Sequence, residues 1–165
     1  MNKTGRVISV AAAALGSMLV VAFAATPTSD RSPAMQKTAK GAFEVKVVPI
    51  AQTEHAGGTT LGRFSLAKTL HGDLEGTGAG EMLTAGTGVA GSAGYVAIER
   101  VEGTLGGRKG TFVLQHSGSM ARGGQSLVIT VVPDSGTGEL TGIAGSLAIE
   151  IDGKAHFYRF EYSLP

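Results

Sequence analysis

Apolar and polar residues alternate with a period of two along most of the chain after residue 41, the pattern of strands that bury one face. In one segment, Phe64, Leu66, Leu70 and Leu74 fall on a single face. Glycine-bearing breaks separate eight such segments, and outside the first 24 residues none shows a convincing helical stripe. The segments are AFEVKVVP, LGRFSLAKTLHG, EGTGAGEMLTAG, AGYVAIERVEGTL, GTFVLQHSGSM, QSLVITVVP, GELTGIAGSLAIEI and AHFYRFEYSL.

Short turns between these segments favour antiparallel neighbours, and Asp152-Gly153 is a favoured two-residue hairpin turn. Glycine contributes 26 of 165 residues without a collagen period, which indicates turns, bulges and strongly bent strands. Closing eight strands into a barrel removes exposed edges and leaves an interior for side chains or one small ligand. We therefore predict an all-β fold, an eight-stranded antiparallel β-barrel from about residue 42 to residue 164.

The first 24 residues follow a different pattern. Lys3 and Arg6 precede an apolar run over 7–21, and Ala22-Phe23-Ala24 follows it. A basic start, a short apolar run and small residues before the cleavage point are typical of a secretory signal peptide. We predict a signal peptide over 1–24, cleavage after Ala24 and a periplasmic or secreted protein. An uncleaved membrane anchor is the alternative, but the run is shorter than the ~20 residues that a spanning helix needs.

Residues 25–40, ATPTSDRSPAMQKTAK, are rich in Pro, Ser and Thr and lack apolar periodicity, so we predict a flexible linker. The β-barrel domain is then expected to occupy 41–165. The chain has no cysteine, which excludes disulfides and thiolate metal sites. Removal of Lys3 and Arg6 would change the formal net charge from +1 to −1 and leave no basic cluster. We therefore expect neither nucleic-acid binding nor, after cleavage, membrane binding.

Four stretches follow one another along the chain: HGDLEGTGAGEML, GSAGYVAIERVEGTLGGRKGTFVLQHSG, VVPDSGTGELTGIAG and YRFEYSL. Together they resemble one bacterial family, the domain of unknown function 3224 (DUF3224). The resemblance covers 42–164 and implies a small barrel similar to plant allene oxide cyclase and dirigent proteins. Those relatives close rings or direct the coupling of apolar intermediates, often as trimers. The resemblance brings no established activity for the family, so it supports the fold better than the function.

Lys68 is the most informative polar residue, because alternation places it on the apolar face of its strand. A buried ammonium group must be paired or have a depressed pKa. Its candidate partners are Glu44, Glu81 and Glu99, each within an otherwise apolar strand. Lys68 is then either half of a structural ion pair, a side chain reaching the barrel rim, or the polar end of a ligand-binding lumen.

Three other patterns are weaker. Ser65 and Lys68 have the Ser-x-x-Lys spacing of some acyl-transfer enzymes, but a separation of three puts them on opposite faces of a strand. His71, Asp73 and Glu75 share a strand face that we interpret as the solvated outside, so no metal site is predicted. The glycines of GTGAGE lack dinucleotide-motif register, and we predict no cofactor.

The remaining lumen candidates are a histidine and two tyrosines. His116 follows Phe112 and Leu114 at strand spacing and is interpreted as a hydrogen-bonded core histidine or a proton-transfer group. Tyr95 and Tyr158 could belong to an aromatic lining or to the core. No catalytic residue is assigned.

Three functions remain open. The first is binding of a small apolar molecule in the lumen, and the second is a cyclase or isomerase acting on an apolar substrate. The third is a structural or assembly protein with a filled barrel. Assembly into a homo-oligomer is compatible with each.

Overall fold

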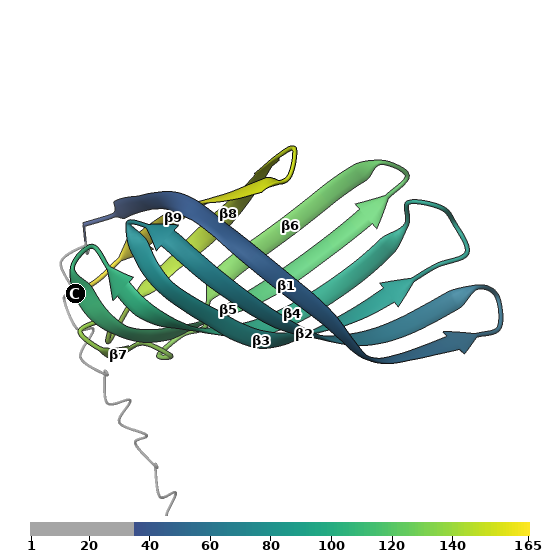
Figure 1. Ribbon diagram of the computed structural model, residues 1–165, viewed down its shortest axis with the longest axis horizontal. Coiled ribbons are helices and arrows are strands. Elements are labelled where there is room, and N and C mark those ends of the chain that lie inside the picture. The colour runs from purple at the N-terminus through teal and green to yellow at the C-terminus, as the bar shows by residue number, and fades with distance from the viewer. Residues whose placement is uncertain (1–34) are drawn as a thin grey trace, which may run out of the picture. The chain divides into compact units, whose positions relative to one another are not determined.

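A computed structural model describes residues 35–165, and the predicted signal peptide and most of the predicted linker lie outside the described residues. Every regular element in the described part is a β-strand (Figure 1). The strands are β1 (Lys37–His55), β2 (Thr59–Gly72), β3 (Leu74–Gly86), β4 (Ala93–Leu105), β5 (Arg108–Ala121), β6 (Gly124–Val131), β7 (Thr137–Gly138), β8 (Ala144–Asp152) and β9 (Ala155–Ser163).

Eight of these strands form a closed antiparallel ring. β1 to β6 pair in sequence, β6 pairs with β8, β8 pairs with β9, and β9 pairs with β1. The short strand β7 lies beside β5 as an addition to the ring. The predicted all-β, eight-stranded antiparallel barrel is therefore confirmed.

Two predicted boundaries differ from the structure. β1 begins at Lys37, and residues 37–43 pair with β9, so the barrel starts four residues before the predicted start of the domain at residue 41. Of residues 37–42 only Ala39 is fully buried, so this part of β1 shows no apolar alternation that would predict a strand. The turn of the last hairpin was predicted at Asp152-Gly153. It lies one residue later, at Gly153 and Lys154, because Asp152 still pairs with Ala155.

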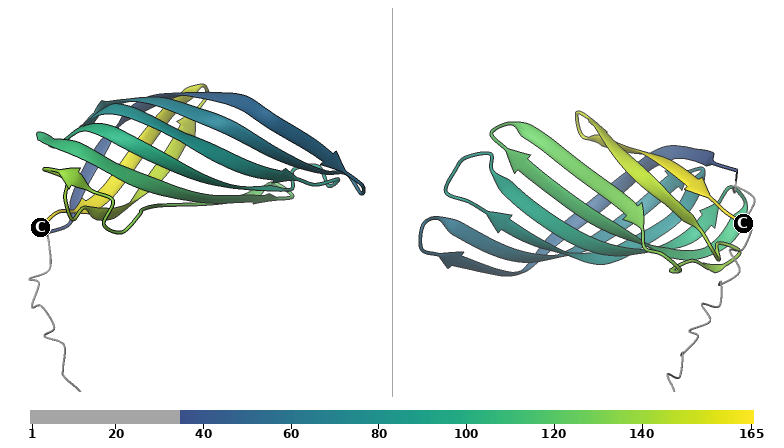
Figure 2. Two further views of the ribbon diagram at one scale, coloured as in Figure 1. Left: turned by 90° about the horizontal axis from the view of Figure 1, so that it is seen from below. Right: turned by 180° about the vertical axis from the view of Figure 1, so that it is seen from behind.

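One end of the barrel is filled with apolar side chains. The rings of Phe112 and Phe160 lie 5.5 Å apart at its centre. The connection between β6 and β8, which contains β7, contributes the buried side chains of Leu140 and Ile143. Figure 2 shows this connection beside the C-terminus, at what we call the filled end.

The opposite end, which we call the open end, is built from strands of unequal length. β1 to β5 have 13 to 19 residues, whereas β6, β8 and β9 have only 8 or 9. The β1–β2 hairpin consequently extends far beyond the β8–β9 hairpin (Figure 1). β6 and β8 pair only through Thr130 and Ser146, so a seam separates these strands toward the open end.

Tyr158 joins three strands at the filled end. Its hydroxyl accepts a hydrogen bond from the Leu74 amide at 2.9 Å and can donate to the carbonyl oxygen of His71 at 3.2 Å or that of Leu74 at 3.3 Å. Its ring passes over Gly41 of β1, where any Cβ would collide with the hydroxyl. Tyr158 faces inward as the alternation predicted, but its hydroxyl is used to hold the β2–β3 turn against β9.

We expect Tyr158→Phe to lower the free energy of unfolding by about 1–3 kcal/mol, because it leaves the buried Leu74 amide without its partner. Urea denaturation would measure the change. Tyr162→Phe is the matched control, since Tyr162 is also buried but its hydroxyl makes no hydrogen bond to the described residues. Equal effects of the two substitutions would contradict the role assigned to the Tyr158 hydroxyl.

Candidate functional site

Three ionisable side chains from different strands meet inside the barrel. Lys68 of β2 donates to Oε2 of Glu99 on β4, with the Nζ to Oε2 distance at 2.7 Å. Nε2 of His116 on β5 lies 3.1 Å from the same oxygen. Because an ionised carboxylate only accepts hydrogen bonds, Nε2 of His116 must carry the hydrogen. We call these three residues the inner charge network.

The network is almost completely removed from water. The side chains of Glu99, His116 and Lys68 are 1%, 4% and 9% exposed. The Lys68 ammonium group also lies 5.1 Å from the centre of the Phe43 ring, a cation–π geometry. Two donors on one carboxylate oxygen make this a tightly held buried ion pair with a third, histidine member.

The second oxygen of Glu99 has a different environment. Oε1 is buried and has no hydrogen-bond partner among the described residues. It lies against Gly78 of β3, where a Cβ would collide with it. The glycine in β3 therefore makes the space that the carboxylate occupies.

Opposing effects determine the protonation of Glu99. Burial raises the pKa of its carboxyl group, but the hydrogen bond to His116 and the charge of Lys68 outweigh burial and hold the pKa below its ordinary value of 4.5. Glu99 is therefore ionised at neutral pH. In this state it neutralises Lys68 and orients His116, but it has no exposed edge with which to meet a substrate.

A pocket of about 340 Å³ lies on the open-end side of the network, and we call it the open-end pocket. Along β4 the inward positions run from Glu99 through Ala97 to Tyr95 and Ala93, and the last two line the pocket. Burial raises the pKa of Tyr95, so its hydroxyl stays neutral. No lining side chain carries a charge. The lining residues are Gln52, Thr60, Met82, Thr84, Ala85, Gly86, Ala93, Gly94, Tyr95, Ser119 and Met120.

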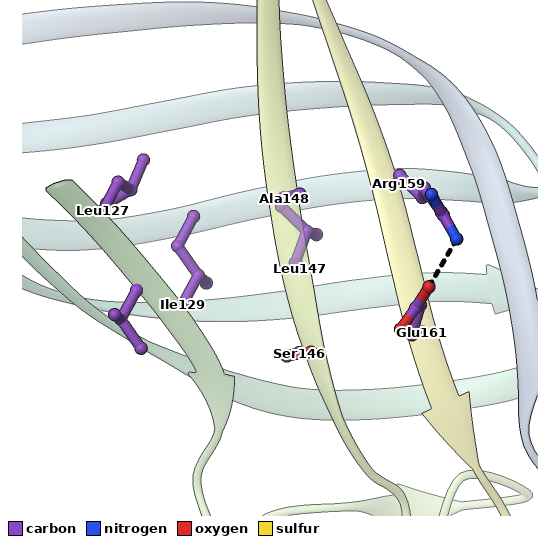
Figure 3. A pocket seen from close by; sticks show the side chains of 8 residues that line it. Leu127, Ile129, Ser146, Leu147, Ala148, Arg159 and Glu161 are labelled. Atoms are coloured by element: carbon purple, nitrogen blue, oxygen red, sulfur yellow. Dashed lines mark hydrogen bonds and ion pairs between the residues drawn. The ribbon is translucent and has the colours of Figure 1, made fainter. Parts of the chain in front are cut away.

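A second hollow, of about 330 Å³, lies in the seam between β6 and β8. Figure 3 shows Leu127 and Ile129 on β6, facing Leu147 across the seam, with Arg159 and Glu161 beside it on β9. Those two charged side chains bond to each other at 2.6 Å. The seam is therefore an apolar gap in the wall with an ion pair at its margin.

Other site types have little support in the described part of the chain. Residues 35–165 contain no group of three or more His, Cys, Asp or Glu side chains suited to a metal ion. The same residues contain no helix long and apolar enough to cross a membrane.

Comparisons with known proteins identify the fold family. A family model described as "Protein of unknown function (DUF3224)" matches residues 39–162. The chain belongs to the DUF3224 family. A crystal structure of a DUF3224 protein of unknown function from Shewanella oneidensis MR-1 is 50% identical, with a TM-score of 0.75. The match covers 79% of this chain and 99% of that one. A comparison with curated proteins found no match.

Five of the six predicted lumen residues of this DUF3224 barrel lie on its inner face. Lys68, Glu99 and His116 form the network, whereas Tyr95 and Tyr158 lie on opposite sides of it. Of the three proposed partners of Lys68, Glu99 is the one that pairs with it. Whether any of these residues binds a ligand stays a prediction.

The placement of Glu81 in the lumen was wrong. Its side chain is 53% exposed on the outer face and pairs with Arg63 at 2.8 Å. The physical reason lies in β3, where the inward positions before Met82 are Gly76, Gly78 and Gly80. Glycine carries no hydrophobic signal, so nothing in the pattern of β3 marks clearly which of its faces is buried.

The polar row of β2 and β3 is on the outside, as predicted. Nδ1 of His71 lies 3.0 Å from a Glu75 oxygen, and Asp73 accepts a hydrogen bond from the Lys40 amide at 2.8 Å. Glu44, another proposed partner of Lys68, is also outside and lies near His71. Gln52, Met82 and Met120 were not among the predicted lumen residues, because strand alternation alone does not show where a barrel stays hollow.

We expect Lys68→Met to lower the free energy of unfolding by about 3–5 kcal/mol, because it leaves the Glu99 carboxylate buried without its cation. Chemical denaturation would measure the loss. Lys46→Met removes an exposed lysine from neighbouring β1 and should be nearly neutral. A loss below about 1 kcal/mol for Lys68→Met would show that the buried pair does not stabilise the fold.

The pKa of Glu99 also predicts acid sensitivity. A carboxyl group with a lowered pKa in the folded state gives its full stabilisation above the ordinary pKa, and that stabilisation is lost as the pH falls through the folded-state pKa. Glu99→Gln should therefore reduce the decline in unfolding free energy between about pH 6 and about pH 3. The unfolding free energy of Glu102→Gln, an exposed change on the same strand, should decline with falling pH as it does in the wild type. An unchanged decline in Glu99→Gln would refute the assignment.

Proposed function

We propose that this DUF3224 protein binds a small, uncharged, mainly apolar molecule in the open-end pocket. The observation that carries the proposal is the asymmetric interior: apolar side chains fill one end of the barrel, and about 340 Å³ stays empty at the other. This volume falls within the range of small-molecule sites in proteins. A barrel that served only as a packed scaffold would have no need of this space.

The lining supports an uncharged ligand. A charged group moved from water into a pocket without a countercharge loses its hydration without compensation. The neutral hydrogen-bonding groups of Gln52, Thr84 and Tyr95 can orient a polar substituent, while Met82 and Met120 supply adaptable apolar contact. The expected ligand is therefore mostly apolar, with one or two neutral polar groups.

The inner charge network has a supporting part in this proposal. It lies between the open-end pocket and the filled end, and its charges neutralise each other. We propose that it forms a rigid floor that limits how deep a ligand can enter. The signal-peptide pattern of the N-terminus supports binding in the periplasm or outside the cell.

The cyclase or isomerase alternative has less support. It needs an acid or base that can reach the substrate, and the side chains of His116 and Glu99 are nearly inaccessible. Glu99 holds Nε2 of His116, so only Nδ1 could accept a proton, and the side chain that carries it is 4% exposed. We therefore favour binding without a reaction.

Binding can be tested with N-phenyl-1-naphthylamine, a neutral apolar dye whose fluorescence rises in an apolar site. We expect the protein to bind this dye at least about 10-fold more tightly than the anionic dye 1-anilinonaphthalene-8-sulfonate, because the lining offers no cation. Met120→Trp, which enlarges an inward side chain at the pocket, should abolish binding with little loss of stability.

Thr69→Trp is the matched control, because Thr69 is an exposed outer-face residue of β2. It should bind the dye like the wild type. Preferential binding of the anionic dye, or dye binding that survives Met120→Trp and disappears in Leu83→Lys on the outer face, would overturn the proposal.

A further inference from the structure

The outer face of β2, β3 and β4 carries a compact patch that the proposed function does not use. Leu83, Val96 and Ile98 are 55%, 53% and 53% exposed. They border a hollow of about 440 Å³ on the barrel wall. Large apolar side chains that expose more than half their surface side by side are typical of interaction sites. These three side chains point away from the barrel interior, and none of them lines the open-end pocket.

The strand register gives the patch a regular layout. Three outward residues from each of three neighbouring strands form three rows across the strands. We call these nine residues the outer patch. Arg63 and Glu81 are its charged members, and they form two hydrogen bonds of 2.8 and 2.9 Å with each other. The rows are Leu61, Ala85 and Gly94, then Arg63, Leu83 and Val96, then Ser65, Glu81 and Ile98.

We propose that the outer patch binds a second copy of this chain and forms a two-fold symmetric dimer. In a face-to-face dimer the two-fold axis lies in the contact plane, so each residue meets the copy of the residue at its mirror position across the axis. The outer patch must therefore be complementary to its own mirror image across the two-fold axis. This is a strict condition that few surfaces meet.

The outer patch meets this condition along the diagonal that runs through Ser65, Leu83 and Gly94. Leu83 then packs against its own copy, and the two small residues allow close approach on either side. Arg63 faces the Glu81 of the second copy, and Leu61 faces the second copy's Ile98. Val96 faces the second copy's Ala85, so every charge meets an opposite charge and every large apolar side chain meets an apolar residue.

Other axes through the centre of the outer patch fail on charge. An axis along β3 places Glu81 against the Glu81 of the second copy. An axis across the strands, along the row of Arg63, Leu83 and Val96, places Arg63 against the Arg63 of the second copy. The second diagonal places Arg63 against Ala85 and Glu81 against Val96. Charge complementarity therefore selects a single arrangement, and in it the hollow beside Ile98 receives Leu61 of the second copy. Nine residues form a small contact, so we expect a weak, concentration-dependent dimer.

Charge reversal provides a direct test. Sedimentation velocity of the protein purified from cells that express the full coding sequence should show a monomer–dimer equilibrium. Arg63→Glu and Glu81→Arg should each weaken dimerisation by more than about 10-fold, because each would place like charges across the contact. An equimolar mixture of the two variants should dimerise again, since both cross-contacts then join opposite charges.

The matched control is Arg159→Glu, which reverses one charge of another exposed ion pair, with Glu161 on β9. It should dimerise like the wild type. A wild-type protein that stays monomeric up to about 1 mM would overturn the proposal. So would a dimer that Arg63→Glu leaves intact, or two variants that fail to associate when mixed. If the hollow instead binds a foreign partner or a small ligand, the wild-type protein will stay monomeric.

Discussion

Closure of the sheet is the constraint on which the rest of this structure depends. Once eight strands form a ring, one face of each strand lies in a shared interior, and every inward side chain must either pack there or find a partner. The strands are unequal, however, because β1 to β5 are much longer than β6, β8 and β9. Closure is therefore complete at the filled end and partial at the open end. The same ring thus produces a packed core and a hollow interior.

The Glu99 carboxylate lies where these two regions meet. A buried charge is tolerated only with partners, and here Lys68 and His116 both bond to one of its oxygens. Gly78 provides the space for the other oxygen, so four strands contribute to a single site. This arrangement uses its ionisable groups to satisfy one another. It consequently suits a rigid boundary of a binding pocket better than a catalytic centre.

The two proposed binding surfaces follow different physical rules. The open-end pocket is inward, uncharged and concave, which favours a small neutral molecule. The outer patch is outward and carries a complementary ion pair beside large apolar side chains, which favours a copy of itself. The two surfaces share β2, β3 and β4 but use opposite faces of them, since successive residues of a strand point to opposite sides.

The sequence by itself determined the eight ring strands, their order and, for most of them, which side chains point into the barrel. Alternation placed Lys68 with Leu66 and Leu70 inside, and it put His71, Asp73 and Glu75 outside, because large apolar side chains mark the buried face clearly. It failed for Glu81, because the inward positions beside it in β3 are glycines, which mark neither face. Tertiary structure alone chose Glu99 among three possible partners of Lys68, because that choice depends on the register between strands that are distant in sequence. It also decided which end of the barrel stays open, since that depends on how strands of different length meet when the ring closes.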